Sequence, residues 1–467
     1  MMNNYKFIDD KKIHSLLNDA KIPDDGRAYD ILRKGRELKG LDSGEIFDLL
    51  NVKDSKIKNE IFKVAKYVKQ EIYGKRLVLF APFYVSNYCQ NECTYCAYRS
   101  QNGGLIRKKL DEEEIIEETK MLLKDGHKRV LLVAGETHSD RDLDFVMESI
   151  DTIYGVRDGT QNIRRINVNI APLSVWQFKR LERCKIGTYQ IFQETYHEET
   201  YGKVHLKGPK SNYNFRLETI DRAFKAGIDD VGIGVLFGLY DWKYEVLAMV
   251  EHIRHLEHQF GVGPHTISVP RIEPALNSPI SKNPPFVVND EDFKLIISVL
   301  RIAIPYTGII LSTRENEKVR REAFELGVSQ ISAGSKTNPG GYNERDKHNA
   351  DNLEQFSLGD TRSTSEVIKD IVQCGYIPSF CTGCYRKGRV GNDFMDLAIP
   401  GLIKEHCIPN GIFTFAEYIH DFGDRSLKKE GRELIDKMLV EIQNEQLQDK
   451  VRDKLSLISD GKRDIFF

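Results

Sequence analysis

The sequence contains little that would place the chain in a membrane, among secreted proteins or on a nucleic acid. No apolar stretch reaches the roughly 18 residues of a membrane span, and the start, MMNNYKFIDDKKIH, lacks the apolar core of a signal peptide. The 467 residues carry a formal net charge of only −2, which argues against a surface dominated by nucleic acid or anionic lipid. We therefore expect a cytoplasmic protein without a nucleic-acid or membrane partner.

Cysteine is scarce, and its eight occurrences are unevenly spread. Two residues, Cys184 and Cys374, stand alone, and the others form two triplets. In a reducing compartment, clustered spacing of this kind indicates metal binding rather than disulfides. We expect the two single cysteines to be small buried hydrophobic residues.

Apolar or β-branched runs recur along the middle of the chain, separated by amphipathic stretches of helical length. Eight such runs predict an α/β fold, a complete (β/α)8 barrel of the triosephosphate-isomerase type with its active site at the carboxyl ends of the strands. An open doubly wound sheet is the alternative, but it would need a nucleotide-binding motif where this chain has cysteines. The expected strands are 77–85, 129–136, 165–172, 188–195, 230–239, 265–273, 308–315 and 330–335.

Four segments are expected along the chain. Residues 1–75 are expected to form an N-terminal helical extension, with charged and apolar positions interleaved and a glycine stop at Gly74. The barrel follows over 76–340, and a polar linker over 341–360 is too hydrophilic to belong to a short barrel loop. Residues 361–467 are expected to form a mostly helical domain that carries the second cysteine triplet.

The first triplet, in CQNECTYC, directly follows the first expected strand. It consists of Cys89, Cys93 and Cys96, one ligand short of a closed tetrahedral zinc site. An iron–sulfur cubane can leave one iron without a protein ligand, and that iron can bind a substrate or cofactor. A zinc knuckle with a distant fourth ligand and a metal-free cysteine loop are the alternatives.

The C-x3-C-x2-C spacing, with the aromatic Tyr95 before the last cysteine, resembles the signature of the radical S-adenosylmethionine (SAM) enzymes. In that family the open iron of a 4Fe–4S cluster chelates SAM. The resemblance implies that Gly135 and Glu136, at the end of the second expected strand, bind the cofactor, the acid meeting its ammonium group. The loop after the first barrel strand lies on the catalytic face, which agrees with this assignment.

Further polar side chains occupy the expected strands or their ends. Asn167 and Asn169 share one face of their strand and are expected to point into the barrel, either as a polar layer of the core or as cofactor contacts. Glu194 and Arg271 end two other strands. For both, a contact to SAM and an ion pair within the barrel mouth are open alternatives.

The seventh expected strand ends in LSTRE, where Ser312 and Arg314 face the same way. A guanidinium in an enclosed mouth suits bidentate capture of a carboxylate. In the tyrosine and tryptophan lyases of the radical SAM group, an arginine in a similar segment grips the amino-acid substrate. The resemblance implies that Arg314, with Ser312 beside it, belongs to the catalytic site.

The second triplet is Cys381, Cys384 and Cys407, spaced C-x2-C-x22-C. A C-x2-C pair alone is compatible with a redox, zinc or structural role. The surrounding sequence, CTGCYRKGRVGNDFMDLA, resembles the C-terminal cluster motif of the FeFe-hydrogenase maturation tyrosine lyases, and the resemblance covers the whole chain. It implies a second iron–sulfur cluster with an open iron.

His265 opens the sixth expected strand and Arg271 closes it, so about 20 Å should separate them. His265 is therefore expected at the end of the barrel opposite the SAM site. A lone histidine at a strand start is more often structural. In the family, however, a histidine in the corresponding HTISVPR segment binds an additional iron at the second cluster, which implies that role for His265.

The resemblance also implies a reaction. A radical SAM lyase of this kind cleaves the Cα–Cβ bond of L-tyrosine to p-cresol and dehydroglycine. Dehydroglycine is converted to carbon monoxide and cyanide, which are captured on iron at the auxiliary cluster for assembly of the hydrogenase H-cluster. The implied partners are SAM, L-tyrosine, free cysteine, an electron-donor protein and the hydrogenase maturation proteins.

Three other functions are compatible with part of the sequence. The 2-iminoacetate-forming tyrosine lyase of thiazole biosynthesis performs the same cleavage but stops at dehydroglycine, and its resemblance does not extend to the second triplet. A non-catalytic iron–sulfur scaffold would have cysteines without a substrate pocket, so Glu136, Arg314 and the eight strands weigh against it. A zinc-stabilised structural protein would be colourless.

Overall fold

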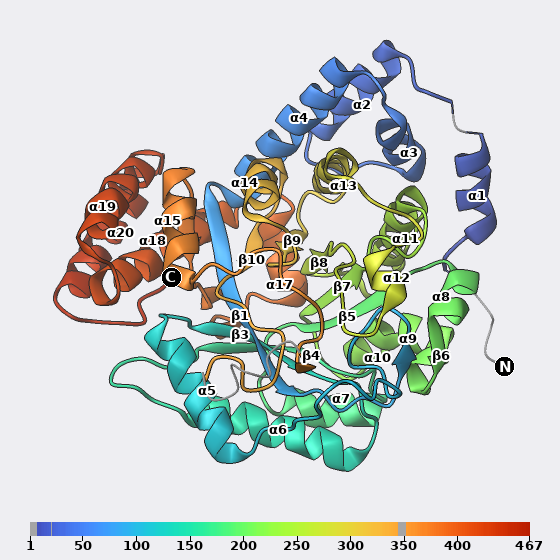
Figure 1. Ribbon diagram of the computed structural model, residues 1–467. Coiled ribbons are helices and arrows are strands. Elements are labelled where there is room, and N and C mark those ends of the chain that lie inside the picture. The colour runs from blue at the N-terminus through green and yellow to red at the C-terminus, as the bar shows by residue number, and fades with distance from the viewer. Residues whose placement is uncertain (1–6, 20, 344–351) are drawn as a thin grey trace.

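Eight parallel strands close into a barrel in the computed structural model, which describes residues 7–19, 21–343 and 352–467. The first strand, β1 (Arg76–Ser86), pairs with both β3 (Arg129–Ala134) and β10 (Gln330–Ser332), which closes the sheet. The predicted (β/α)8 barrel is therefore confirmed (Figure 1). The remaining barrel strands are β4 (Arg165–Asn169), β5 (Tyr189–Glu194), β7 (Val231–Val235), β8 (Thr266–Ser268) and β9 (Gly308–Leu311).

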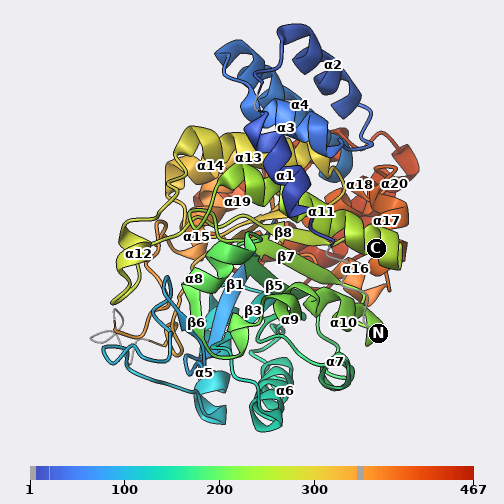
Figure 2. The same cartoon turned by 90° about the vertical axis from the view of Figure 1, so that its right-hand side faces the viewer.

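Helices cover the outside of the barrel and connect its strands (Figure 2). Helix α5 (Glu112–Lys124) begins at a capping box, in which the side chains of Asp111 and Glu114 each accept a hydrogen bond from the other's main-chain N–H. Acidic residues fill its first turn, where the helix dipole stabilises negative charge. The other helices between barrel strands are α6 (Asp140–Gly155), α7 (Val175–Glu182), α8 (Glu198–Val204), α9 (Tyr213–Leu217), α10 (Thr219–Lys225), α11 (Trp242–Phe260), α12 (Pro279–Lys282), α13 (Asp290–Ala303) and α14 (Glu317–Leu326).

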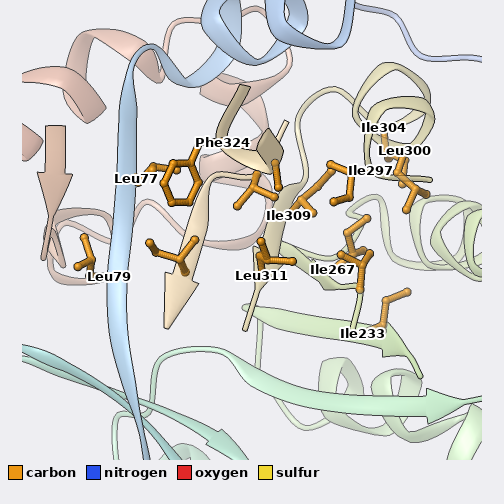
Figure 3. Packing of buried hydrophobic residues seen from close by; sticks show 14 of the residues in the cluster. Leu77, Leu79, Ile233, Ile267, Ile297, Leu300, Ile304, Ile309, Leu311 and Phe324 are labelled. Carbon is orange, nitrogen blue, oxygen red and sulfur yellow. The ribbon is translucent and has the colours of Figure 1, made fainter. Parts of the chain in front are cut away.

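Buried apolar side chains fill the space between the strands and these helices. On β1, Leu77 and Leu79 belong to this core and are fully buried. The alternate residues Phe80 and Tyr84 instead line a cavity in the barrel, as expected for side chains that point to opposite faces of a strand. Figure 3 shows Leu77 beside Phe324 of α14. One strand thus serves both the core and the cavity.

The chain before the barrel is helical where the structure describes it, as predicted. Its helices are α1 (Asp10–Asn18), α2 (Asp25–Gly35), α3 (Ser43–Asn51) and α4 (Ser55–Tyr73). Helix α4 packs against α13 and α14. It ends at the predicted glycine stop, because Gly74 has a φ of 66°, a conformation that glycine adopts without steric cost.

The chain after the barrel adds one strand that the sequence analysis did not anticipate. Strand β11 (Ile377–Ser379) pairs in parallel with the first residues of β1, Arg76 to Val78. A three-residue strand containing proline shows no recognisable period, which explains why it was missed. The helices of this region are α15 (Thr364–Gln373), α16 (Gly383–Arg386), α17 (Gly391–Ala398), α18 (Lys404–Asp421), α19 (Arg425–Val440) and α20 (Glu445–Ser459).

Other expectations differ from the structure or fall outside it, and every expected strand after the first is shorter in the structure than predicted. The sixth strand, expected over 265–273, covers only Thr266–Ser268, because Pro270 offers no N–H to a sheet ladder. The expected linker over 341–360 includes 344–351, which lie outside the described residues. None of the helices that the structure describes is long and apolar enough to cross a membrane.

The carboxyl group of Glu245 predicts a specific pH dependence of folding stability. It is fully buried in α11 and accepts hydrogen bonds from the main-chain N–H of Tyr196 at 2.8 Å and from the hydroxyl of Thr195. Burial raises its pKa from the ordinary 4.5 to about 8. Because the folded-state pKa is the higher one, this group's contribution to stability is greatest below pH 4.5 and is lost as pH rises towards 8.

We expect Glu245→Gln to remove this part of the pH dependence, since glutamine keeps the shape and the acceptor oxygen but does not ionise. Free energies of unfolding from urea titrations at pH 5 and pH 8 should differ less in the variant than in the wild type, by an amount on the order of a few kcal/mol. The exposed Glu148, changed to glutamine, is the control. If stability changed equally between pH 5 and pH 8 in the wild type and both variants, the assignment would be contradicted.

Candidate active site and second cluster site

A cavity at the carboxyl ends of the barrel strands gathers most of the predicted site residues. It is lined by the whole first triplet, by residues from the ends of several strands and by aromatic side chains such as Tyr84 and Phe192. The predicted site residues that line it are Cys89, Cys93, Tyr95, Cys96, Gly135, Glu136, Asn169, Glu194, Ser312 and Arg314.

The loop that carries the first triplet is held by polar contacts on both sides. The carboxylate of Glu92 accepts hydrogen bonds from Arg99 at 2.9 Å, from the hydroxyl of Ser100 at 3.0 Å and from the main-chain N–H of Gln101 at 2.9 Å. Residues Glu92–Cys93 form β2, which pairs antiparallel with β6 (His205–Lys207). The backbone around the three thiols is therefore fixed by the protein itself.

Gly135 has a steric role that explains its position next to this loop. A Cβ atom on Gly135 would lie 2.2 Å from the main-chain oxygen of Tyr88. The main-chain N–H of Gly135 donates to Ser86 at 2.8 Å, and that of Gln90 donates to the carbonyl of Glu136 at 3.0 Å. Only glycine lets the end of β3 approach the cysteine loop this closely.

The first triplet fits an iron–sulfur cluster better than a single zinc ion. Three thiolates on one zinc ion, at about 2.3 Å each, would lie roughly 4 Å apart. Within the described residues, no three cysteine sulfurs come within 4.8 Å of one another. Burial raises the pKa of Cys89 to about 11, and it also raises the pKa values of Cys93 and Cys96. These thiols would ligate as thiolates only beside a positively charged metal centre, so the spacing of the sulfurs, and not their pKa values, favours the cluster.

A buried network of two acids and two bases lies beside the triplet. Glu136 accepts hydrogen bonds from Arg216 at 3.0 Å, from Lys210 at 3.2 Å and from the side-chain amide of Asn91 at 3.0 Å. Lys210 also donates to Glu194 at 2.7 Å. The Arg216 and Lys210 side chains are only 3% and 7% exposed, so both charges depend on these partners.

The network determines the protonation state of Glu136. Burial alone would raise the pKa of this carboxyl group, but Arg216 and Lys210 together lower it to about 2. Glu194 reaches the network from a residue with a φ of 71°, at an irregularity in the pairing of β5 with β7. A left-handed conformation in a non-glycine residue costs about 1 kcal/mol or more and is concentrated at functional sites. Both carboxylates thus line the cavity, where they can meet a cationic ligand.

Lys210 and Arg216 were not predicted from the sequence. Lys210 lies between β6 and α9 and Arg216 lies in α9, a stretch that contains no strand end and no recognisable motif. The available signal was chemical: two acids expected in a closed barrel mouth require nearby cations, and KGPKSNYNFR supplies them.

Arg314 lies in the cavity with its charge uncommitted. Its guanidinium carbon lies 3.3 Å from the centre of the Phe356 ring, and its main-chain N–H donates to the hydroxyl of Ser312 at 3.4 Å. In the part of the chain that the structure describes, no carboxylate forms an ion pair with it, and burial lowers its pKa. A substrate carboxylate would supply the missing partner.

Arg271 is not brought into the cavity. Its guanidinium donates to Glu315, at 2.9 Å from Nε, and pairs with Asp290 at 2.9 Å. Of the two alternatives left open for this residue, the structure favours the ion pair. A direct SAM contact by Arg271 has no geometric support.

The second triplet surrounds a site with unmet hydrogen-bond donors. Cys381 follows β11, Cys384 lies in α16 and Cys407 in α18, and the main-chain N–H of Gly383 donates to the sulfur of Cys381 at 3.3 Å. Within the described residues, several buried donors near these thiols have no partner, which fits an anionic cluster. They are Arg76 Nε, Arg129 Nη2, Arg389 Nε and Asn410 Nδ2.

The two triplets lie at opposite ends of the barrel, and β1 reaches both. Its first residue, Arg76, donates from Nη2 to the sulfur of Cys407 at 3.1 Å. Its last residue, Ser86, lies three positions before Cys89. An eleven-residue strand spans about 30 Å, so the barrel interior separates the two sites.

His265 lies at the same end of the barrel as the second triplet. Its ring stacks on Phe394 of α17 at 4.1 Å and faces Tyr385 of α16 at 6.0 Å between centroids. Its Nδ1 is 2.9 Å from a carboxylate oxygen of Asp230. The expected position, opposite the SAM site, agrees with these contacts, while the role as an iron ligand stays a prediction.

Comparisons with known proteins agree with one class. Residues 83–253 match the radical SAM superfamily, and residues 268–377 match the Biotin and Thiamin Synthesis associated domain. The 2-iminoacetate synthase of Salmonella typhimurium is 30% identical over 362 residues, which cover 77% of this chain and 92% of that protein. The barrel, the cysteine loop and these matches define a radical SAM enzyme, a class that uses SAM and a 4Fe–4S cluster.

Two crystal structures narrow the class. One of HydG, a maturase of the FeFe-hydrogenase, superposes with a TM-score of 0.94 and 48% identity, covering 99% of this chain and 100% of that chain. HydG from Carboxydothermus hydrogenoformans gives a TM-score of 0.83 and 41% identity, covering 95% of this chain and 97% of that chain. The chain belongs to the HydG family of FeFe-hydrogenase maturases.

Proposed function

We propose that this chain cleaves the Cα–Cβ bond of L-tyrosine to p-cresol and dehydroglycine, and that dehydroglycine is then converted to carbon monoxide and cyanide and captured on iron. The observation that carries the proposal is the placement of two cysteine triplets at opposite ends of one closed barrel. Two further observations support it: the chain belongs to the HydG family, and Arg314 lies without a carboxylate partner among the described residues in the cavity at the carboxyl ends of the strands.

Different residues of the cavity bind the iron–sulfur cluster and SAM. A 4Fe–4S cluster held by Cys89, Cys93 and Cys96 supplies, when bound, the electron that cleaves SAM. Glu136 and Glu194 attract the ammonium group of SAM, and ion pairs with Lys210 and Arg216 hold both carboxylates in place. Tyr95 donates to or accepts from His205 at 2.9 Å, which holds its ring against the cavity wall.

The substrate is held on the other side of the cavity. Arg314 binds the carboxylate of L-tyrosine through two parallel N–H groups, and Ser312 fixes the backbone beside it. Tyr84, Phe192 and Phe356 form apolar walls that exclude water from the radical. Asn169 donates to the main-chain oxygen of Gln190 at 3.1 Å, so in this structure it stiffens the strand ends.

The reaction balances without an oxidant. One electron converts SAM to methionine and a 5′-deoxyadenosyl radical, which takes a hydrogen atom from tyrosine. The Cα–Cβ bond breaks, and a second electron with one proton completes p-cresol. Dehydroglycine then yields carbon monoxide, hydrogen cyanide and water with no further redox change. An electron-donor protein must therefore supply both electrons.

In the proposal, carbon monoxide and cyanide are captured at the site of the second cysteine triplet. A second cluster at Cys381, Cys384 and Cys407 and an additional iron at His265 would hold carbon monoxide and cyanide, with free cysteine as a further ligand. The unpartnered Arg76 and Arg129 donors lie where they would stabilise an anionic assembly. A cytoplasmic location and contacts with other hydrogenase maturation proteins also remain predictions.

The test is an anaerobic turnover of reconstituted protein with SAM, L-tyrosine and a strong reductant, assaying p-cresol, cyanide and carbon monoxide in parallel. We expect the wild type to make all three. Cys384→Ala should keep p-cresol and lose carbon monoxide, because it removes a ligand of the second site alone. Cys374→Ala is the matched control, since this half-buried cysteine belongs to neither triplet.

The other outcomes select the alternatives. A wild type that makes p-cresol alone, with its second cluster intact, acts as a 2-iminoacetate synthase like the Salmonella relative. If the wild type makes none of the three products although both clusters are intact, the protein is a non-catalytic iron–sulfur scaffold. Loss of p-cresol in Cys384→Ala would contradict the assignment of tyrosine cleavage to the cavity beside the first cysteine triplet.

A further inference from the structure

Three side chains of metal-ligating type lie close together on the outer surface of the molecule, and none of them belongs to a cysteine triplet. Asp10 and His14 lie one turn apart on α1, and His197 is the N-cap of α8. One ligand atom from each lies within 4.8 Å of those of the other two. We propose that these three residues bind a divalent transition-metal ion of the zinc class.

The donor set matches that class of ion. Two imidazole nitrogens and one carboxylate oxygen, with water as fourth ligand, are typical of zinc sites. An ion about 2 Å from each donor requires only small side-chain movements from the present spacing. Magnesium prefers oxygen ligands and is not expected to bind here.

Each of the three side chains is already oriented by a contact to its other polar atom. His14 Nδ1 lies 2.9 Å from the main-chain oxygen of Asp10, so a proton there leaves Nε2 with a lone pair. His197 Nδ1 lies 2.8 Å from the hydroxyl of Thr200 and accepts the N-cap bond from the main-chain N–H of Thr200 at 3.3 Å. Binding of an ion through Nε2 therefore requires the tautomer in which Nδ1 donates to the hydroxyl and gives up the capping bond. The hydroxyl of Tyr244 donates to Asp10 Oδ1 at 2.7 Å and leaves the second oxygen open. Such contacts behind the ligands are what metal sites in proteins use to fix ring orientation and tautomer.

Aromatic packing holds the rings further. Tyr240 stacks on His197 at 3.8 Å with an angle of 3° between planes, and its hydroxyl lies 3.4 Å from His14 Nε2. His14 also contacts the Tyr244 ring at 5.2 Å. All three ligands are thus restrained, although the site stays open to solvent, with the Asp10 side chain 58% exposed.

The position of the site indicates what the ion would do. Figure 1 shows α1 next to the α8 end of the barrel, at the far right of the molecule. Helix α8 leads directly into β6, and β6 pairs with β2, where Cys93 lies opposite His205. A metal bridge from α1 to the start of α8 would therefore brace the segment that covers the first cysteine loop.

The test measures zinc and iron together in anaerobically reconstituted protein that carries both clusters. Samples are incubated with zinc or magnesium, desalted and analysed by mass spectrometry of the metals, and their melting temperatures are recorded. The variants are His14→Gln, which suits a helix, and His197→Asn, which keeps an N-cap side chain for α8. His258→Ala removes an exposed histidine at the other end of α11 as the matched control.

We expect the wild type and His258→Ala to retain one zinc per chain with unchanged iron and to melt at a higher temperature with zinc. His14→Gln and His197→Asn should bind zinc at least about tenfold more weakly and show no zinc-dependent shift. Because the two variants change different elements, misfolding of one leaves the other as the test. Equal zinc retention in all four proteins, or zinc uptake matched by iron loss, would overturn the proposal.

Discussion

Replacing Arg314 by methionine is expected to lower kcat/KM for L-tyrosine by roughly 30- to 5,000-fold, the equivalent of the 2–5 kcal/mol lost when one partner of a buried charged pair is truncated. The reason is that Arg314 is the cation in this cavity that no carboxylate engages in the described part of the chain, whereas Lys210 and Arg216 are already paired. Methionine keeps the apolar stem of the side chain but removes the guanidinium, and with it both the contact to the Phe356 ring and the capacity to bind a carboxylate.

The measurement separates the substrate from the cofactor. SAM binding should change little in Arg314→Met, because the Glu136 network is untouched, while p-cresol formation falls. Arg314→Lys should recover only part of the loss, since lysine restores the charge without the bidentate geometry. Arg432→Met, on the surface helix α19, is the control. If SAM affinity fell as far as tyrosine turnover, Arg314 would belong to the cofactor site instead.

The barrel could be predicted from the sequence because its strands are buried on both faces. Such strands appear as short continuous apolar runs, and eight of them alternating with helical stretches leave few other folds. Strand β8 was predicted too long because burial continues past Ser268, through Val269 and Pro270, where the regular ladder gives way to a single bridge between Arg271 and Phe237. Strand β11 was missed for the opposite reason, since three residues carry no period.

The cysteine ligand sets were predictable because the ligands of each set lie close together in the sequence. Arg314 was predictable because it follows a barrel strand, and the ends of the strands line the cavity. The partners of the acids were not. Lys210 and Arg216 enter the cavity from a segment after α8, and only the folded barrel brings them to Glu136. A buried acid indicates that a cation lies nearby in the fold. Which residue supplies that cation depends on the path of a loop and could not be predicted.

Arg216→Met is the second change with a large expected effect. It leaves Glu136 with Lys210 as its only strong cationic partner, and Lys210 is shared with Glu194. Breaking one side of a buried ion pair costs on the order of 3–5 kcal/mol. We expect the urea midpoint at pH 7 to fall accordingly and the pKa of Glu136 to rise. SAM should bind more weakly because the Glu136 carboxylate loses the hydrogen bonds from Arg216 that orient it.

The double variant Arg216→Met/Glu136→Gln distinguishes the network from simple loss of packing. Glutamine removes the uncompensated charge while keeping the side-chain shape, so stability should recover most of what Arg216→Met loses, as buried ion pairs replaced on both sides often do. SAM affinity should not recover, since the carboxylate proposed to meet its ammonium group is gone. Recovery of both properties would show that Glu136 does not contact SAM, and recovery of neither would assign the effect of Arg216 to its hydrogen bond with the main-chain oxygen of Phe192.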